Sequence, residues 1–279
     1  MGKRALITGA SKGIGEELAK IYAKNGYDLI LVARDYEKLN VIKNNLEGAF
    51  NVDVKVISMD LTLPSSSEVL FNSLRHNRVD VLINNAGMGS YGEFHKSDLK
   101  KEEDLIMLNV LSLMKLSFLY SNMMVENGGG TIINIASTAS FQAGPLMSNY
   151  YASKAYVLSF TEAISKELKK NNVKVIAYCP GPTKTGFLET ANVSKEDLDK
   201  ENMMSPKLVA QDIYDKSIKS NKSVIIQGKK FKLALFFERF ISRRTATNFV
   251  YNIQKKRTKA ENENETKTEN DDDIYKLNL

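Results

Sequence analysis

Residues 4–15 read RALITGASKGIG, a short apolar run that passes directly into a glycine-rich turn. The run predicts a buried strand, and the residues after the turn predict a helix. Glycines let the backbone turn sharply and let a phosphate come close, and the start of the helix offers unpaired N–H groups. The glycine spacing, Gly-x-x-x-Gly-x-Gly, differs from the commonest dinucleotide motif. The turn therefore indicates a phosphate-binding site, with a βα turn that binds nothing as the alternative.

Apolar runs and helical stretches alternate along the rest of the chain. The predicted strands are Arg4–Thr8, Leu29–Ala33, Val54–Ser58, Val79–Asn84, Thr131–Ile135, Val173–Cys179 and Val224–Ile226. The predicted helices are Ile14–Asn25, Asp35–Leu46, Ser65–His76, Lys101–Glu126, Tyr150–Lys170 and Pro206–Ser220. Several strands are nearly continuous Val, Ile and Leu, as buried parallel strands are. The pattern predicts an α/β fold, a doubly wound, parallel, seven-stranded sheet with helices on both faces.

The composition is that of an ordinary globular protein. Of the 279 residues, 43% are hydrophobic and 26% charged, which excludes a largely disordered chain. One Cys and two isolated His, His76 and His95, argue against a disulfide framework and against a metal site. The net charge of +6 is too small and too mixed to indicate nucleic-acid binding. We find neither an apolar run of about 20 residues nor a signal peptide, so we expect a soluble, cytoplasmic protein.

The end of the second predicted strand bears on the choice of dinucleotide. An acidic residue there would bind a ribose 2′-hydroxyl and favour NAD. This strand instead ends at Ala33 and is followed by Arg34, while Lys12 supplies a second cation from the glycine turn. Two cations suit a 2′-phosphate and favour NADP(H). Asp35 leaves the question open because it could pair with Arg34, and both cations could simply be solvated.

A tyrosine, a lysine and a group of hydroxyls form the candidate catalytic set. Tyr150 and Lys154 are four residues apart on a predicted helix, so they lie on one face. A nearby ammonium lowers the pKa of a phenol and makes it a better acid–base group. Upstream, Ser137 and Ser140 follow a strand at the end where ligands bind in open α/β sheets. Each feature alone is ordinary surface or turn chemistry, and it is their joint occurrence that indicates a site.

Together these features resemble the motif series of the short-chain dehydrogenase/reductases. The resemblance runs from about Lys3 to Ile226 and rests on motifs that occur in the family's order: Thr8-Gly9-x-x-x-Gly13-x-Gly15, Asp60-Leu61, Asn84-Asn85-Ala86-Gly87, Asn109, Ser137, Tyr150-x-x-x-Lys154 and Pro180-Gly181. Each motif alone is a weak signal. The resemblance implies one Rossmann-type domain that interconverts a ketone and a secondary alcohol by hydride transfer with a nicotinamide cofactor, which the charges of Arg34 and Lys12 favour as NADP(H).

The resemblance also implies a role for each matching residue. Tyr150 would be the general acid in reduction and the general base in oxidation, and Lys154 would lower its pKa and hold the nicotinamide ribose. Ser137 would bind the substrate carbonyl, and Asn109 would hold a water for proton relay. The cofactor-binding residues would be Gly9, Ser11, Lys12, Gly13, Ile14, Gly15, Arg34, Asp60, Leu61, Asn85, Ala86, Gly87, Tyr150, Lys154, Pro180, Gly181, Thr183 and Thr185.

The predicted substrate pocket is apolar. We expect Phe141–Met147, Met88–Tyr91 and Gly186–Met204 to wall it, and the predicted substrate-binding residues are Ser137, Phe141, Met147, Tyr150 and Leu188. A small-molecule ketone of acyl type, such as a 3-oxoacyl group, would suit such a pocket. A hydroxysteroid-type or general ketone reductase is an alternative within the enzyme class. Outside that class, the alternatives are a non-catalytic NADP-binding redox sensor and a basic scaffold that binds nucleic acid or membrane.

The C-terminal part departs from many members of this family. We divide the chain into a domain over 1–228, a basic amphipathic extension over 229–254 packed on it, and a disordered polar tail over 255–279. The extension has three interpretations, which are core over the active site, a dimer contact, and a helix on an anionic membrane surface. We favour the first, leaving peripheral membrane contact through 229–251 open. From the resemblance we expect a homodimer or homotetramer.

Overall fold

The structure, a computed structural model, describes residues 2–185 and 203–255. Seven parallel strands form one sheet in the order β3-β2-β1-β4-β5-β6-β7. They are β1 (Arg4–Thr8), β2 (Asp28–Ala33), β3 (Val54–Ser58), β4 (Val81–Asn84), β5 (Gly130–Ile135), β6 (Val173–Cys179) and β7 (Val224–Ile226). The predicted seven-stranded Rossmann-type sheet is confirmed, and every predicted strand end lies within two residues of the observed one.

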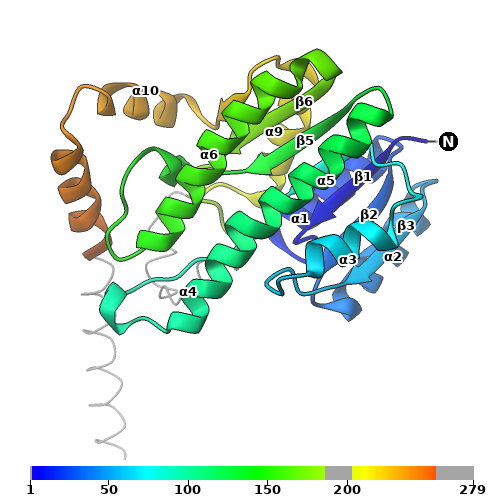
Figure 1. Ribbon diagram of the computed structural model, residues 1–279, viewed down its shortest axis with the longest axis horizontal. Helices are drawn as coiled ribbons and strands as arrows, with labels where there is room; N and C mark the ends of the chain where they lie inside the picture. Colours follow the sequence, from blue (N-terminus) through cyan, green and yellow to red (C-terminus); the bar gives the residue numbers. More distant parts are fainter. Residues whose placement is uncertain (1, 186–202, 256–279) are drawn as a thin grey trace, which may run out of the picture.

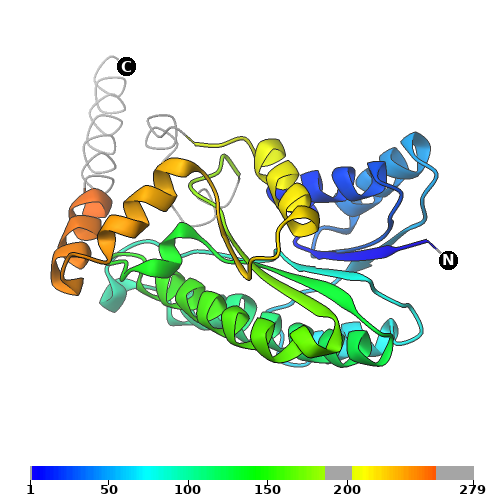
Figure 2. The ribbon, with the colours of Figure 1, turned by 90° about the horizontal axis from the view of Figure 1, so that it is seen from above.

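Side chains of β1 alternate between two buried clusters, so both faces of the sheet need cover. Ala5 and Ile7 belong to one cluster and Leu6 to the other. The first face is covered by α1 (Gly13–Lys24), α2 (Tyr36–Ala49) and α9 (Pro206–Lys219). The second is covered by α3 (Ser66–Ser73), α5 (Leu113–Glu126) and α6 (Ser148–Leu168). Figure 2 shows the sheet between these two helical layers.

The helical stretch before β5 differs from the single predicted helix Lys101–Glu126. It begins at Leu99, because the Asp98 side chain accepts a hydrogen bond from the Lys100 amide at 2.8 Å and so caps α4 (Leu99–Ile106). A π-helical turn, η2 (Met107–Ser112), then leads into α5. By length and composition the stretch could cross a membrane, yet α5 packs a buried face into the core of the fold. The π turn is the local feature that positions Asn109.

The strand order reverses between β1 and β4, and this reversal places the ligand crevice. Helix α1 leaves β1 on one face of the sheet, whereas α5 lies on the other. Connections that diverge in this way leave a crevice at the carboxyl ends of the strands. The glycine turn after β1 and the segment after β4 meet at that crevice.

The C-terminal extension is helical and lies at the same end of the molecule. Helix α10 (Lys229–Glu238) is followed by a second helix over residues 243–255, and both lie apart from the two layers (Figures 1 and 2). The Phe231 ring packs against Gly181, just after β6, where a Cβ on the glycine would lie 2.5 Å from the ring. Most of the predicted loop Gly186–Met204 and nearly all of the predicted tail lie outside the described residues.

Candidate active site

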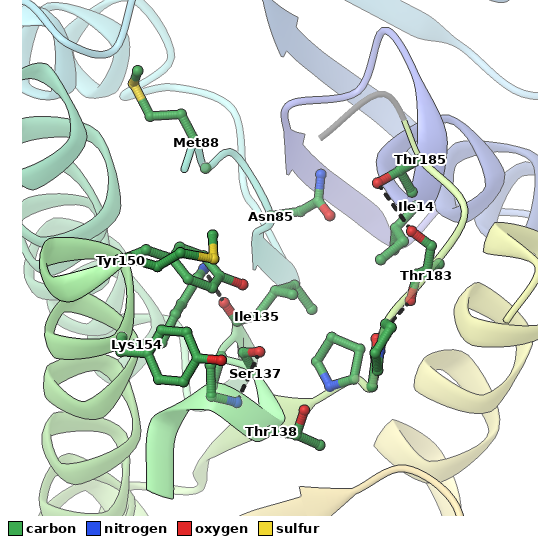
Figure 3. A pocket seen from close by; sticks show the side chains of 18 of the residues that line it. Ile14, Asn85, Met88, Ile135, Ser137, Thr138, Tyr150, Lys154, Thr183 and Thr185 are labelled. Carbon is green, nitrogen blue, oxygen red and sulfur yellow. Dashed lines mark hydrogen bonds between the residues drawn. The ribbon is translucent and has the colours of Figure 1, made fainter. Parts of the chain in front are cut away.

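One cleft of about 890 Å³ opens at the carboxyl ends of the strands. Its walls come from the glycine turn, the ends of β2, β4, β5 and β6, the start of α6, and the C-terminal extension. In Figure 3, Tyr150 and Lys154 from α6 lie beside Ser137, while Thr183 and Thr185 form the opposite wall. The sequence-predicted residues therefore meet in one place, apart from those named below.

The glycine turn is shaped so that side chains are excluded. Gly9 has a φ of +66°, and a Cβ there would lie 2.9 Å from Ala86 Cα. Gly13 has a φ of +60°, and a Cβ there would lie 3.0 Å from Thr185 Cγ2. The Asn85 amide nitrogen donates to Thr8 O at 2.9 Å and to Gly9 O at 3.2 Å, which fixes the turn against the end of β4.

Helix α1 begins at this turn without a side-chain cap, since Lys12 makes no capping hydrogen bond. The first amides of α1 are thus left for a ligand, and the dipole favours an anion there. A turn without Cβ atoms, an uncapped helix and a long cleft together fit a dinucleotide.

Three cations, Lys12, Arg34 and Lys38, line the end of the cleft beside β2. Asp35, which left the choice of dinucleotide open, caps α2 by accepting from the Lys38 amide at 3.0 Å and pairs with the Lys38 ammonium at 3.3 Å. The Arg34 side chain is 76% exposed and lies 4.0 Å from the Asp60 carboxylate, so its guanidinium is available to a ligand. Asp60 itself accepts from the amide and hydroxyl of Thr62.

Ser137 and Ser140 both follow β5, but their hydroxyl groups have different hydrogen-bonding roles. The Ser140 hydroxyl accepts from the Ser137 amide at 3.2 Å, and the Ser137 hydroxyl accepts from the Ala139 amide at 3.1 Å, a reciprocal capping box. The Ser137 hydroxyl also hydrogen-bonds to Tyr150. Ser140 is thereby committed to the turn, and Ser137 is the hydroxyl that faces the cleft.

Lys154 is nearly inaccessible, at 5% exposure, and its ammonium donates to Ile135 O at 2.8 Å. Burial lowers the pKa of Lys154 to about 8. Burial also raises the pKa of Tyr150 to about 12, and the hydrogen bond from Ser137 opposes that rise. The expected lowering of the Tyr150 pKa by Lys154 stays a prediction, because the causes of this rise are burial and the neighbouring Tyr151, opposed by Ser137.

Asn109 lies behind the catalytic pair and does not line the cleft. Its amide nitrogen donates to Met88 O at 2.9 Å and to the Ser153 hydroxyl at 3.1 Å, and its oxygen accepts from the Met88 amide at 3.0 Å. Gly87 passes close by, and a Cβ there would lie 3.2 Å from the Asn109 oxygen and 3.5 Å from Lys154 Nζ. The side chain thus ties the segment after β4 to α6, and the predicted role in proton relay stays a prediction.

Two other predicted residues in the described part of the chain do not line the cleft. Gly15 lies beneath the turn, where a Cβ would be 2.2 Å from Gly9 O, so it serves close packing of α1. Phe141 packs against the cluster around Val157 and lines a neighbouring hollow. Leu188 lies outside the described residues. The remaining predicted residues, including Pro180, Gly181, Thr183, Thr185 and Met147, line the cleft.

The structure adds residues that the sequence did not single out. Lys38 could have been found, because it stands three residues after an N-cap and so one turn above Arg34. Gln254 is buried, and its amide nitrogen donates to the Tyr151 hydroxyl at 3.1 Å. Glu238 lines the cleft, and burial raises its pKa. Over the described ranges, no group of three His, Cys, Asp or Glu residues could hold a metal ion.

Comparisons with known proteins agree with this geometry. A model of the short-chain dehydrogenase family matches residues 3–196. The very-long-chain 3-oxoacyl-CoA reductase of Mus musculus is 34% identical over 204 residues, which cover 72% of this chain and 64% of that protein, so less than two thirds of its length is matched. A 7beta-hydroxysteroid dehydrogenase of Mediterraneibacter gnavus is 29% identical over 187 residues, 67% of this chain and 71% of that protein.

Solved structures give the same result. A short-chain dehydrogenase from Sphingobium yanoikuyae, solved in complex with NADPH, is 32% identical with a TM-score of 0.78, over 85% of this chain and 93% of that one. The family match covers well over half of the chain, and the sheet order and the cleft agree with it. The chain therefore belongs to the short-chain dehydrogenase/reductase family of nicotinamide-dependent oxidoreductases.

Proposed function

We propose that this oxidoreductase uses NADPH to reduce the ketone of an apolar, acyl-type substrate such as a 3-oxoacyl thioester. The proposal rests on the residues that line the cleft from one end to the other. It runs from the Tyr150–Ser137 pair to an apolar wall supplied by the C-terminal extension. The polar end suits a single carbonyl group, and the rest suits a chain or ring system that brings few polar atoms.

The preference for NADPH rests on charge. Arg34 is exposed at the edge of the cleft, Lys12 and Lys38 lie along the same edge, and Asp35 is engaged by Lys38. A guanidinium matches phosphate geometry with two parallel hydrogen bonds. The NADPH bound to the relative from Sphingobium yanoikuyae is consistent with this choice.

Each catalytic side chain has a defined task in the proposed reduction. A bound NADPH supplies the hydride that forms the new C–H bond at the carbonyl carbon. The Ser137 hydroxyl donates a hydrogen bond to the carbonyl oxygen and stabilises the charge that develops there. Tyr150 gives its phenolic proton to that oxygen, and the product is the alcohol. The ammonium of Lys154 stabilises the phenolate left on Tyr150 until a proton from solvent restores the phenol.

The apolar wall supports a bulky substrate. Phe231, Leu235, Phe237, Phe249 and Val250 of the extension all line the cleft. Fully burying one such side chain or an equivalent piece of substrate is worth about 1.5–3 kcal/mol, so the wall favours a long or wide apolar group. The names of the mouse and Mediterraneibacter gnavus relatives denote substrates of this kind, a very-long-chain acyl group and a steroid.

The test is a panel of ketones assayed by NADPH oxidation. It would contain 3-oxoacyl-CoA thioesters of increasing chain length, a 7-oxo steroid and a charged polyol ketone. We expect turnover that improves with acyl chain length and is lost in Tyr150→Phe. Tyr156→Phe, on the same helix and stacked on Phe160 outside the cleft, is the matched control and should keep full activity.

Three outcomes would count against the proposal. Turnover of the charged polyol alone would contradict the apolar substrate, and preferential turnover of the steroid would favour the hydroxysteroid alternative. Tight NADPH binding without turnover of any ketone would favour a redox sensor.

A further inference from the structure

The C-terminal extension presents an aromatic surface to solvent. Phe236, Phe237, Phe240 and Phe249 are between 52% and 74% exposed. Phe236 contacts both Phe237 and Phe240, with ring centroids 5.7 Å and 5.5 Å apart. Monomeric soluble proteins rarely expose such a group of large rings, and contiguous patches of this kind mark interaction sites. We call these four rings the aromatic patch.

The aromatic patch is continuous with the mouth of the cleft. Phe237 and Phe249 belong to the patch and also line the cleft. One side of the second helix of the extension is buried, since Ala246, Val250 and Gln254 recur at four-residue spacing and are each 8% exposed or less. The same helices thus close one side of the cleft and expose aromatic rings around its entrance. The core and surface interpretations of the extension are therefore compatible.

The aromatic patch is set among positive charges. Residues 229–244 contain six Lys or Arg and one acidic residue, so this segment holds most of the chain's net charge of +6. All six basic residues are exposed. Lys229, Lys230 and Lys232 begin α10, and Arg239, Arg243 and Arg244 flank the turn that carries Phe240.

A partner that binds this surface has to offer an apolar environment to the aromatic rings and negative charge to the Lys and Arg side chains. A second copy of the chain in a two-fold dimer would bring the same six cations against each other, which is unfavourable. A purely apolar partner would leave the cations without a counter-charge. A bilayer with anionic headgroups supplies negative charge at its surface and an apolar layer a few ångströms deeper, which matches interleaved Phe and Lys or Arg.

We propose that the aromatic patch and the six surrounding cations dock on an anionic lipid bilayer, with the mouth of the cleft against the membrane surface. Docking in this orientation would let an apolar substrate enter from the membrane without crossing water. The proposal concerns binding alone, so it stands or falls separately from the proposed reaction.

Co-sedimentation of the full-length chain with vesicles tests it. Vesicles of phosphatidylcholine containing phosphatidylserine should bind the protein at least about tenfold more strongly than pure phosphatidylcholine vesicles. Two variants outside the lining of the cleft should each weaken binding about tenfold or more: a charge reversal, Lys229→Glu/Lys230→Glu/Lys232→Glu, and an apolar removal, Phe236→Ser/Phe240→Ser. Thermal melting of each variant would confirm that it is folded.

Matched controls lie on other parts of the molecule. Lys166→Glu/Lys169→Glu/Lys170→Glu reverses three exposed charges near the end of α6, and Leu208→Ser/Ile218→Ser removes two exposed apolar side chains from α9. Both should bind vesicles as the wild type does. Equal losses in the controls would overturn the proposal, because binding would then not belong to this surface.

A spectroscopic probe gives an independent readout. The chain contains no Trp, so Phe240→Trp introduces a single indole into the aromatic patch. Anionic vesicles should shift its emission to the blue, and brominated lipids should quench it. Three further results would overturn the proposal: wild-type protein that stays in the supernatant with anionic vesicles, binding that depends on the lysines but not on Phe236 and Phe240, and an indole that stays in water.

Discussion

Replacing Arg34 with alanine should weaken NADPH binding and leave NADH binding nearly unchanged. Two unit charges about 4 Å apart interact by about 1 kcal/mol in water and about 4 kcal/mol at an effective dielectric constant of 20. The Arg34 side chain is 76% exposed, so the value for water is the better guide. A phosphate monoester carries a charge of about −1.5 to −2 at neutral pH, which brings the expected loss to about 2 kcal/mol.

A loss of about 2 kcal/mol is about 30-fold in the NADPH dissociation constant. The fold itself should be little affected, because the 4.0 Å contact between Arg34 and Asp60 is exposed, and such pairs contribute about 0–1 kcal/mol. Isothermal titration calorimetry with both dinucleotides measures the effect directly. Higher salt should reduce the difference between NADPH and NADH in the wild type and have less influence in Arg34→Ala.

The control for this experiment is Lys43→Ala, which removes a cation from the same helix as Lys38. Lys43 pairs with Glu47 at 3.5 Å and does not line the cleft, so both dissociation constants should stay the same. If Arg34→Ala weakened NADPH and NADH equally, or changed neither, the assignment of the β2 edge to a 2′-phosphate would be refuted.

Two other predictions follow from burial and packing. Because burial lowers the pKa of Lys154 to about 8 and raises that of Tyr150 to about 12, Lys154 loses its proton first as the pH rises. The kcat/KM for NADPH should therefore fall above about pH 8 with the inflection removed in Lys154→Arg, and a profile flat to alkaline pH would contradict this. Gly15→Ala places a Cβ 2.2 Å from Gly9 O and should cost about 3 kcal/mol, a fall of roughly 6–12 °C in Tm. Gly48→Ala, which meets nothing within 4 Å, should leave Tm unchanged or higher, and equal Tm values for the two variants would refute the packing argument.

The sheet could be predicted from the sequence because its signals are local. Runs such as Val173–Cys179 are bounded by polar or glycine-containing turns, and the predicted and observed ends of β6 coincide. The start of α4 was predicted two residues late because the prediction left out the N-cap Asp98, whose side chain accepts from the Lys100 and Lys101 amides. The π turn around Asn109 carries no local sequence pattern that periodicity could detect.

In the candidate site, too, the features that depend on local spacing were predictable, and those that depend on distant contacts were not. Spacing along one helix brings Tyr150 and Lys154 to one face, so their neighbourhood was predictable. The rise of the Tyr150 pKa could not be predicted, because it depends on how much water the assembled walls of the cleft exclude. The position of Phe231 against Gly181 joins residues far apart in the chain. Phe231 and Phe236 look alike in sequence, yet one lines the cleft and the other is exposed.

The predicted catalytic residues and the apolar wall of the cleft lie in different parts of the chain. The family model ends at residue 196, and all of the predicted catalytic residues lie before that point. The apolar wall of the cleft, from Phe231 to Gln254, lies after it. The predicted catalytic residues therefore lie in the part shared with the family, and much of the apolar lining of the cleft lies in the part that the family model does not reach. Exchanging the extension between relatives should accordingly change which ketone is accepted, and it should leave in place the nucleotide preference that we propose for Arg34.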